Sequence, residues 1–381
     1  MATKELNLGI LAHVDAGKTT LTERLLYEAG AIDELGSVDA GTTQTDSLTL
    51  EQQRGITIRS AVASFPMGDV HVNLIDTPGH PDFIAEVERV LSVLDGAVLV
   101  ISGVEGVQPQ TRLLMRALQR LRIPTLVFVN KIDRPGAGDE RVLQDISERL
   151  TTAVVPMGTP HALGTRAAYF TLSSAEDRSF RDRLAEVLAD RDEGIMEAYV
   201  EDESDYQLLR DALAEQTKRA LVHPVFFGSA VTGAGVESLM TGIAELLPAS
   251  AGDPDGPASG TVFKIERAPN GEKIAYVRMF SGTIHTRERL RFGRGLEDKV
   301  TGIPSSSAGL PYNVHRSPQA LSQSSGVSPR SRSATGSARP EPKHQTVISR
   351  RRHWSRSLSW VTTMTARGSA SRSPSSPSRT R

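Results

Sequence analysis

The chain has 381 residues, and its 44 Lys and Arg nearly balance its 45 Asp and Glu, so the formal net charge at pH 7 is −1. The lack of cysteine excludes a disulfide framework and thiol chemistry. The apolar run near the N-terminus is too short for a secretory signal peptide, and no apolar stretch approaches the length that crosses a bilayer. We therefore expect a cytoplasmic protein without membrane contact.

The first predicted strand, residues 6–11, leads into Ala-His-Val-Asp-Ala-Gly-Lys-Thr at residues 12–19, and a helix is predicted next. This order is typical of a phosphate-binding loop, because backbone N–H groups and the helix N-terminus then face the phosphates. We expect Lys18 to reach the β- and γ-phosphates and the Thr19 hydroxyl to bind Mg²⁺. Because Ala12 replaces the usual first glycine, an ordinary strand–helix turn is the alternative. The predicted phosphate contacts are Asp15, Ala16, Gly17, Lys18, Thr19 and Thr20.

A second predicted strand, residues 70–75, delivers Asp-Thr-Pro-Gly-His at residues 76–80. A carboxylate at a strand end suits the Mg²⁺ shell, so we expect Asp76 to act there through a water molecule. The N–H group of Gly79 is expected to bind the γ-phosphate. On position alone, His80 could equally be a structural histidine.

Two further strand ends carry groups suited to a purine base. Residues 124–129 precede Asn130, Lys131 and Asp133, and residues 225–227 precede Ser229 and Ala230. The Asp133 carboxylate can accept hydrogen bonds from N1–H and the exocyclic amine of guanine, a pair that adenine lacks. The turn at Ser229 and Ala230 suits the guanine oxygen. The alternative is that Asn130 and Asp133 cap the next helix.

These motifs occur with segments that resemble one family. Gly-Ser-Val-Asp at 36–39, Gly-Thr-Thr-Gln-Thr-Asp at 41–46, Gln-Arg-Gly-Ile-Thr-Ile at 53–58, Ser-Val-Leu-Asp-Gly-Ala at 92–97 and Gly-Val-Gln-Pro-Gln-Thr-Arg at 106–112 are the clearest. Over about residues 4–300 the chain resembles the tetracycline-resistance ribosomal protection proteins, which are relatives of elongation factor G.

The resemblance implies roles for particular residues. Thr57 would close on Mg²⁺ and the γ-phosphate, so Thr19, Thr57 and Asp76 form the predicted metal set. His80 would position the attacking water, with Val14 and Ile56 as an apolar gate beside it. Asp15 would lie near the β/γ bridge, where the family holds a monovalent cation. The resulting catalytic set is His80, Thr57 and Lys18.

Alternating strands and helices predict an α/β fold, a doubly wound mixed sheet of the P-loop NTPase class, over residues 1–248. Helices are predicted at 20–28, 110–121, 206–221 and 236–246. About ninety residues separate Asp133 from Gly228, so we expect an inserted subdomain, as in the elongation factor G branch. Residues 249–259 are predicted to be a linker. Residues 260–300, with strands at 261–265 and 274–280, resemble the start of a second-domain β-barrel.

Residues 301–381 differ in composition from the rest of the chain. They hold 12 Arg, 1 Lys and one acid, Glu341, so their charge is +12 and that of residues 1–300 is −13. With 21 Ser and no apolar periodicity, this tail is expected to be disordered and to lack a packed core. A frameshift near residues 301–307 would explain it, since codons chosen for residues 319–330 give a barrel-like sequence two bases later. A disordered RNA-binding arm is the alternative.

The sequence thus predicts a GTPase that uses GTP/GDP and Mg²⁺, acts as a monomer, and binds the ribosome but neither DNA nor a membrane. The resemblance implies that it dislodges tetracycline from the ribosome. Because the domains that reach the decoding site are not recognisable here, we expect this chain to bind GTP but to protect ribosomes poorly. The alternatives are an elongation factor G-type translocation GTPase, a non-catalytic GTP- or RNA-binding fragment, and an inert pseudogene product.

Overall fold

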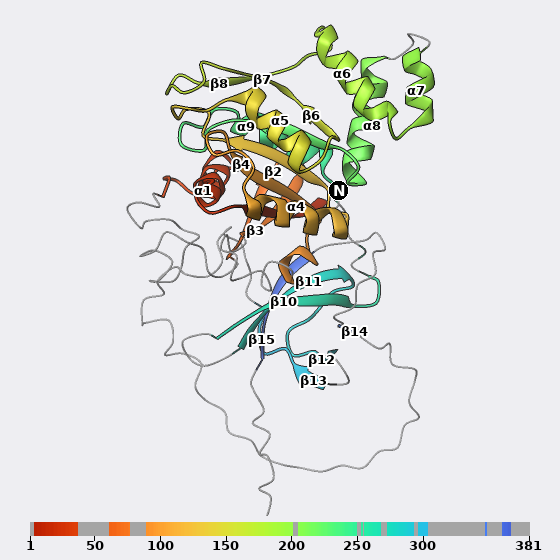
Figure 1. The fold of residues 1–381 in the computed structure, drawn as a ribbon. Helices are drawn as coiled ribbons and strands as arrows, with labels where there is room; N and C mark the ends of the chain where they lie inside the picture. Colours follow the sequence, from red (N-terminus) through yellow and green to blue (C-terminus); the bar gives the residue numbers. More distant parts are fainter. Residues whose placement is uncertain are drawn as a thin grey trace, which may run out of the picture. The chain divides into compact units, whose positions relative to one another are not determined.

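The computed structural model describes residues 4–36, 61–76, 89–200, 205–249, 253, 255–267, 273–292, 296–303, 347–348 and 360–366. These residues form two compact units (Figure 1). The described part of the first unit ends at Ala249, and that of the second begins at Asp253.

The first unit is built on a seven-stranded sheet in the order β2-β3-β1-β4-β5-β9-β6. Its strands are β1 (Lys4–Ala12), β2 (Ala61–Met67), β3 (Val70–Asp76), β4 (Gly96–Ser102), β5 (Thr125–Asn130), β6 (Val154–Pro156) and β9 (His223–Phe227). Only β2 is antiparallel to its neighbour, and the other pairings are parallel. The predicted α/β fold with a mixed sheet is therefore confirmed. Central strands buried on both faces explain the nearly continuous apolar runs in β4 and β5.

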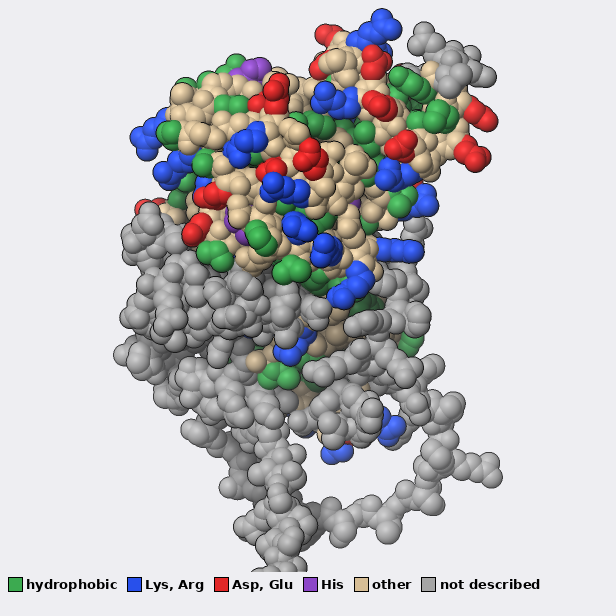
Figure 2. Space-filling model, in the orientation of Figure 1, with side chains coloured by type: hydrophobic (Ala, Val, Ile, Leu, Met, Phe, Trp, Pro, Cys, Tyr) green, Lys and Arg blue, Asp and Glu red, His purple; other side chains and the backbone are tan. Residues whose placement is uncertain are grey.

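Helices cover both faces of this sheet. Helices α1 (Lys18–Glu28) and α9 (Val236–Leu246) pack with Leu6, Leu8 and Ile10 in one core. Helix α4 (Pro109–Leu121) contacts β1 and β4, burying Leu114 and Leu118 at helical spacing. Figure 2 shows Lys and Arg side chains gathered over α4, whose outer face is basic. All these helices were predicted within a few residues.

The long segment between β5 and β9 forms further elements. These are α5 (Asp139–Arg149), β6, β7 (Gly158–His161), β8 (Tyr169–Leu172), α6 (Arg178–Ala189), α7 (Glu193–Val200) and α8 (Tyr206–Lys218). Helix α8 ends three residues before the predicted end at 221. Ala220 has φ 56°, and the N–H of Leu221 bonds the Gln216 carbonyl at 2.9 Å, so the chain turns there toward β9.

The second unit holds a six-stranded sheet in the order β13-β12-β14-β10-β11-β15. The strands are β10 (Ser259–Arg267), β11 (Lys273–Ser281), β12 (Arg289–Phe292), β13 (Leu296–Lys299), β14 (Val347–Ile348) and β15 (Trp360–Ala366). The strands predicted at 261–265 and 274–280 are confirmed as β10 and β11. Val277, Met279, Leu290 and Val300 form a small core with Ile284.

Two strands of this sheet, β14 and β15, come from residues 301–381, which were predicted to be disordered. β15 pairs antiparallel with β11 along its whole length, from Trp360 opposite Met279 to Ala366 opposite Lys273. Its Trp, Val and Thr residues are strong strand formers, which explains the local difference from the expectation. Most of residues 301–381 lie outside the described residues, so the frameshift hypothesis stays a prediction.

Candidate nucleotide-binding site

The predicted phosphate loop lies at the carboxyl end of β1, between β3 and β4. Gly17 caps α1 with φ 91°, a left-handed conformation that favours glycine. A Cβ atom on Gly17 would collide with Nδ2 of Asn130, so this position has no room for a side chain. Asp15 is also left-handed, with φ 64°, and exposed. The loop thus has the tight backbone that a phosphate cradle requires.

Asn130, the last residue of β5, joins the phosphate loop to the turn after β9. Its Nδ2 donates to the carbonyl oxygen of Ala16 at 2.8 Å, and its Oδ1 accepts the N–H of Ala230 at 2.9 Å. Both bonds are buried, so the three loop segments are fixed relative to one another. The geometry gives Asn130 a positioning role, and its predicted contact with guanine stays a prediction.

Asp133 brings a buried carboxylate to the segment that follows β5. Its side chain is 8% exposed, and among the described residues its Oδ1 is buried without a hydrogen-bond partner. Its Oδ2 lies 3.8 Å from Nε of Arg134. A buried carboxylate oxygen without a donor is unfavourable, so this site fits a ligand that brings N–H groups.

The helix-cap alternative for Asn130 and Asp133 is wrong. Helix α5 begins at Asp139, and its N-cap is Gly138. Both residues therefore lie well before the first turn that they would have to cap. Turns and irregular backbone separate both residues from α5, so neither side chain caps that helix.

The turn after β9 is held by α1. Nε and Nη2 of Arg24 donate to the carbonyl oxygens of Ala230 and Val231 at 3.0 and 2.7 Å. The N–H of the buried Ser229 donates to the Ala234 carbonyl at 2.9 Å. The N–H groups of Ser229 and Ala230 thus already have protein acceptors, and a guanine oxygen would share them in three-centre bonds. The role of Arg24 has no sequence signal, because it resembles an ordinary helix-surface arginine.

His13, which the motif analysis passed over, is a structural part of the phosphate loop. Its ring is 5% exposed, with Nδ1 at 3.1 Å from the Thr111 hydroxyl and Nε2 at 3.5 Å from Oε2 of Glu105. Burial lowers the pKa of His13, more than the neighbouring Glu105 raises it, so the ring is neutral at pH 7. The next N–H, that of Val14, donates to Oε1 of Gln110 at 3.4 Å.

The predicted metal and catalytic residues are only partly described. Lys18, Thr19 and Thr20 form the first turn of α1, and the Lys18 side chain is buried. Asp76 ends β3 opposite Ile10. Four predicted residues lie outside the described ones, namely Ile56, Thr57, Gly79 and His80. The Mg²⁺ set therefore stays a prediction.

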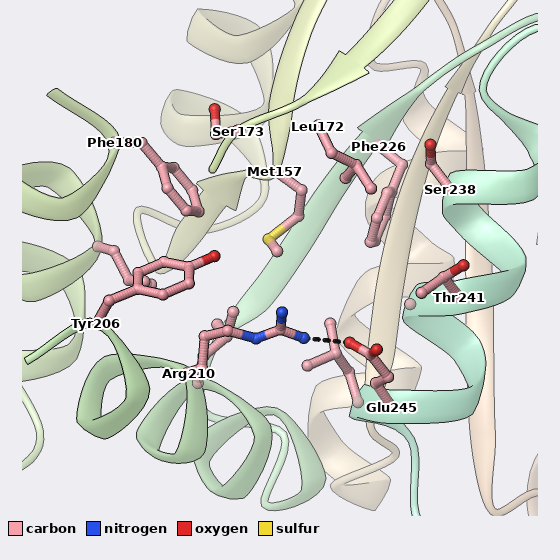
Figure 3. A pocket seen from close by; sticks show the side chains of 14 residues that line it. Met157, Leu172, Ser173, Phe180, Tyr206, Arg210, Phe226, Ser238, Thr241 and Glu245 are labelled. Carbon is pink, nitrogen blue, oxygen red and sulfur yellow. Dashed lines mark hydrogen bonds and ion pairs between the residues drawn. The ribbon is translucent and has the colours of Figure 1, made fainter. Parts of the chain in front are cut away.

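A separate cavity of about 100 Å³ lies among α6, α8, α9 and β9 (Figure 3). Phe180, Tyr206 and Phe226 line it, and Arg210 of α8 forms an ion pair with Glu245 of α9 across it. It contains none of the predicted site residues. We therefore treat it as a packing gap between the inserted helices and α9.

The profile of the family described as "Elongation factor Tu GTP binding domain" matches residues 3–249. The chain belongs to this family. Membership explains why the phosphate loop, Asn130 and the turn at Ala230 meet at one end of the sheet. The family is described as a GTP-binding domain, so GTP is the ligand against which the geometry of the site is compared.

Named relatives extend the likeness into the second unit of this GTP-binding-domain protein. It is 58% identical over 293 residues to the oxytetracycline resistance protein of Streptomyces rimosus, covering 76% of this chain and 44% of that protein. It is 51% identical over 305 residues to the tetracycline resistance protein TetM of Streptomyces lividans, covering 78% and 47%. The chain thus spans about half the length of the curated relatives it matches.

Among solved structures, a protein from Thermus thermophilus is similar with a TM-score of 0.68 and 28% identity. The match covers 79% of this chain and 49% of that one.

Within the described residues, none of the helices is both long and apolar enough to traverse a bilayer.

Proposed function

We propose that this protein binds GTP and GDP through the loops at the carboxyl ends of β1, β3, β5 and β9, and hydrolyses GTP. The observation that carries the proposal concerns Oδ1 of Asp133, which is buried and has no hydrogen-bond partner among the residues that the structure describes. Asn130 joins the segment of Asp133 to the phosphate loop. The N1–H and the amine of guanine are donors of the kind that this oxygen lacks. Family membership supports the same nucleotide.

The phosphates are proposed to lie over residues 15–20. Gly17 supports this position, since its backbone conformation and the nearby Asn130 leave room for no side chain. Lys18 would neutralise charge on the β- and γ-phosphates. Thr19, Thr57 and, through water, Asp76 would hold Mg²⁺, which would add further neutralisation of the phosphate oxygens.

Hydrolysis requires a water molecule to attack the γ-phosphorus while the bond to the β,γ-bridging oxygen breaks, giving GDP and phosphate. We assign orientation of that water to His80 and closure of the site to Thr57. The exposed Val14 on the loop supports its proposed place in the gate with Ile56. Because the sequence offers no obvious arginine finger in this chain, we expect slow intrinsic turnover that a partner raises.

The partner we propose is the ribosome, and the cellular role we propose is tetracycline resistance by ribosomal protection. The support is the identity to the oxytetracycline and tetracycline resistance proteins named above. A translocation factor of the elongation factor G type would have the same chemistry. Deletion of the gene separates the two, since our proposal predicts normal growth in drug-free medium and loss of whatever resistance this chain, expected to protect poorly, still confers.

Calorimetry on the 381-residue protein tests the nucleotide assignment. We expect binding of GDP and of a non-hydrolysable GTP analogue, none of ADP, and loss of binding in Lys18→Ala. Phosphate release with and without ribosomes then tests hydrolysis. A folded protein, verified by circular dichroism, that gives no heat with either guanine nucleotide would overturn the proposal.

A further inference from the structure

Glu105, in the loop between β4 and α4, lies between the phosphate loop and the predicted base-binding segment. Its Oε2 is 3.5 Å from Nε2 of His13, and its Oε1 is 3.4 Å from Nζ of Lys131. The main-chain N–H groups of Val104 and Glu105 both donate to the Ser102 hydroxyl at 3.3 Å, which fixes the loop that carries the carboxylate. One carboxylate therefore contacts both parts of the proposed nucleotide site.

The hydrogen bonds around His13 have a single consistent direction. The ionised Glu105 carboxylate can only accept, so Nδ1 of a neutral His13 ring is the acceptor of the Thr111 hydroxyl. Oγ1 of Thr111 in turn accepts the N–H of Gln108 at 3.3 Å. A neutral ring then carries its hydrogen on Nε2, which donates to Glu105. The first turn of α4 and Glu105 thus hold the His13 ring from both sides.

The charges on Glu105 favour the same arrangement. Partial burial alone would raise the pKa of Glu105, yet the Ser102 hydrogen bond, the Lys131 charge and the His13 bond together leave it below its ordinary value. The carboxylate is therefore ionised at neutral pH and attracts Lys131. Lys131 has φ 68°, an unfavourable conformation for a residue with a side chain, so an interaction that holds it there has structural value.

We propose that Glu105 is a positioning residue that couples the placement of Lys131 to that of the phosphate loop through His13. The inference rests on the proposed GTP-binding function. It assigns a control of nucleotide affinity to the loop before α4, because Glu105 lies outside both motifs and contacts the phosphate loop at His13 and the base-binding segment at Lys131. Glu105 is 41% and Lys131 24% exposed, so an ion pair between them without this coupling would contribute almost nothing to nucleotide affinity or to the free energy of unfolding.

A double-mutant cycle on the full chain tests the coupling, with GDP dissociation and affinity as readouts. The variants are Glu105→Gln, Lys131→Gln and both together, and Glu140→Gln on the exposed face of α5 is the matched control. Gln keeps an acceptor for His13 but removes the charge that holds Lys131. We expect Glu105→Gln to speed GDP release about fivefold and Glu140→Gln to leave it unchanged. The double variant should release GDP within about twofold of Lys131→Gln.

Additive effects, or a Glu105→Gln variant that behaves like Glu140→Gln, would overturn the inference. The His13 ring resonances supply a readout that lost stability alone would not give, since Glu105→Gln should shift the Nε2 signal. If Glu105→Gln fails to fold, Glu105→Asp takes its place, because the shortened carboxylate should also weaken the coupling. If the wild-type protein binds no guanine nucleotide, the proposed function itself is refuted. The comparison of variants tests only the role of Glu105.

Discussion

The side-chain amide of Asn130 lies 2.8 Å from the carbonyl oxygen of Ala16, and this buried bond joins two loops that are 114 residues apart in the sequence. The other end of the same amide accepts the N–H of Ala230. One side chain at the end of β5 therefore fixes the distance between the phosphate loop and the turn after β9. The span of a bound nucleotide has to match that distance.

Replacing Asn130 with Ala should weaken both GDP and GTP binding, since it removes both bonds and leaves buried backbone groups without partners. We expect the free energy of unfolding to fall by about 1–3 kcal/mol. Urea unfolding and calorimetry on the same preparation measure the two effects. Gln144→Ala on the exposed face of α5 is the control, and equal nucleotide affinity in both variants would contradict the positioning role.

Asp133→Asn should change the base preference from guanine to xanthine. Xanthine carries an oxygen where guanine has its amine, so an amide N–H at this position gains an acceptor while the amide oxygen keeps N1–H. We expect GDP affinity to fall by at least about a hundredfold and XDP affinity to rise. Competition binding with both nucleotides measures the change. Unchanged GDP binding would show that Asp133 does not contact the base.

Gly17→Ala should abolish nucleotide binding, because the new Cβ would collide with Nδ2 of Asn130 and the backbone has φ 91°. Gly30→Ala is the matched control, since Gly30 also has positive φ, at 68°, but nothing lies within 4 Å of its Cβ position. We expect each variant to lose about 1 kcal/mol of stability from backbone strain, and Gly17→Ala to lose more because it also displaces the Asn130 amide. Only Gly17→Ala should lose GDP binding, and equal affinities would argue against a close cradle.

Glu5 should make stability depend on pH. Its side chain is 4% exposed, and burial, opposed by the hydrogen bond from Asn73 and assisted by the charge of Asp95, raises the pKa of Glu5 to about 7. The folded protein therefore holds this proton more tightly than the unfolded chain. The stability this contributes is fully present below pH 4.5 and is lost as the pH rises through 7.

The measurement for Glu5 is urea unfolding at pH 5 and pH 8 for the wild type and Glu5→Gln. Because Gln stays neutral, the variant should lose less stability over this interval, by roughly 3 kcal/mol at most. Glu140→Gln should follow the wild type. An identical pH dependence in wild type and Glu5→Gln would show that this carboxyl is ionised in the folded protein.

Local sequence determined the elements and the order of the motifs. Apolar-rich stretches of six residues identify β1, β3 and β5, and apolar residues at helical spacing identify α1, α4 and α9, because the period of the apolar residues shows which face is buried. The residue types that follow each strand predict the binding of phosphate and of guanine. The end of α8 was harder, because a left-handed Ala220 has no pattern in the sequence.

Only the tertiary structure decided which side chains hold the site together. Asn130 was predicted to contact the base, and the fold adds two backbone partners that its motif does not indicate. The contacts of Arg24, Glu105 and His13 have no sequence signal, since the Arg24–Ala230 and Glu105–His13 pairs are 206 and 92 residues apart in the chain. Contacts between residues so far apart depend on strand order and loop placement, so they cannot be predicted from the spacing of residues along the chain.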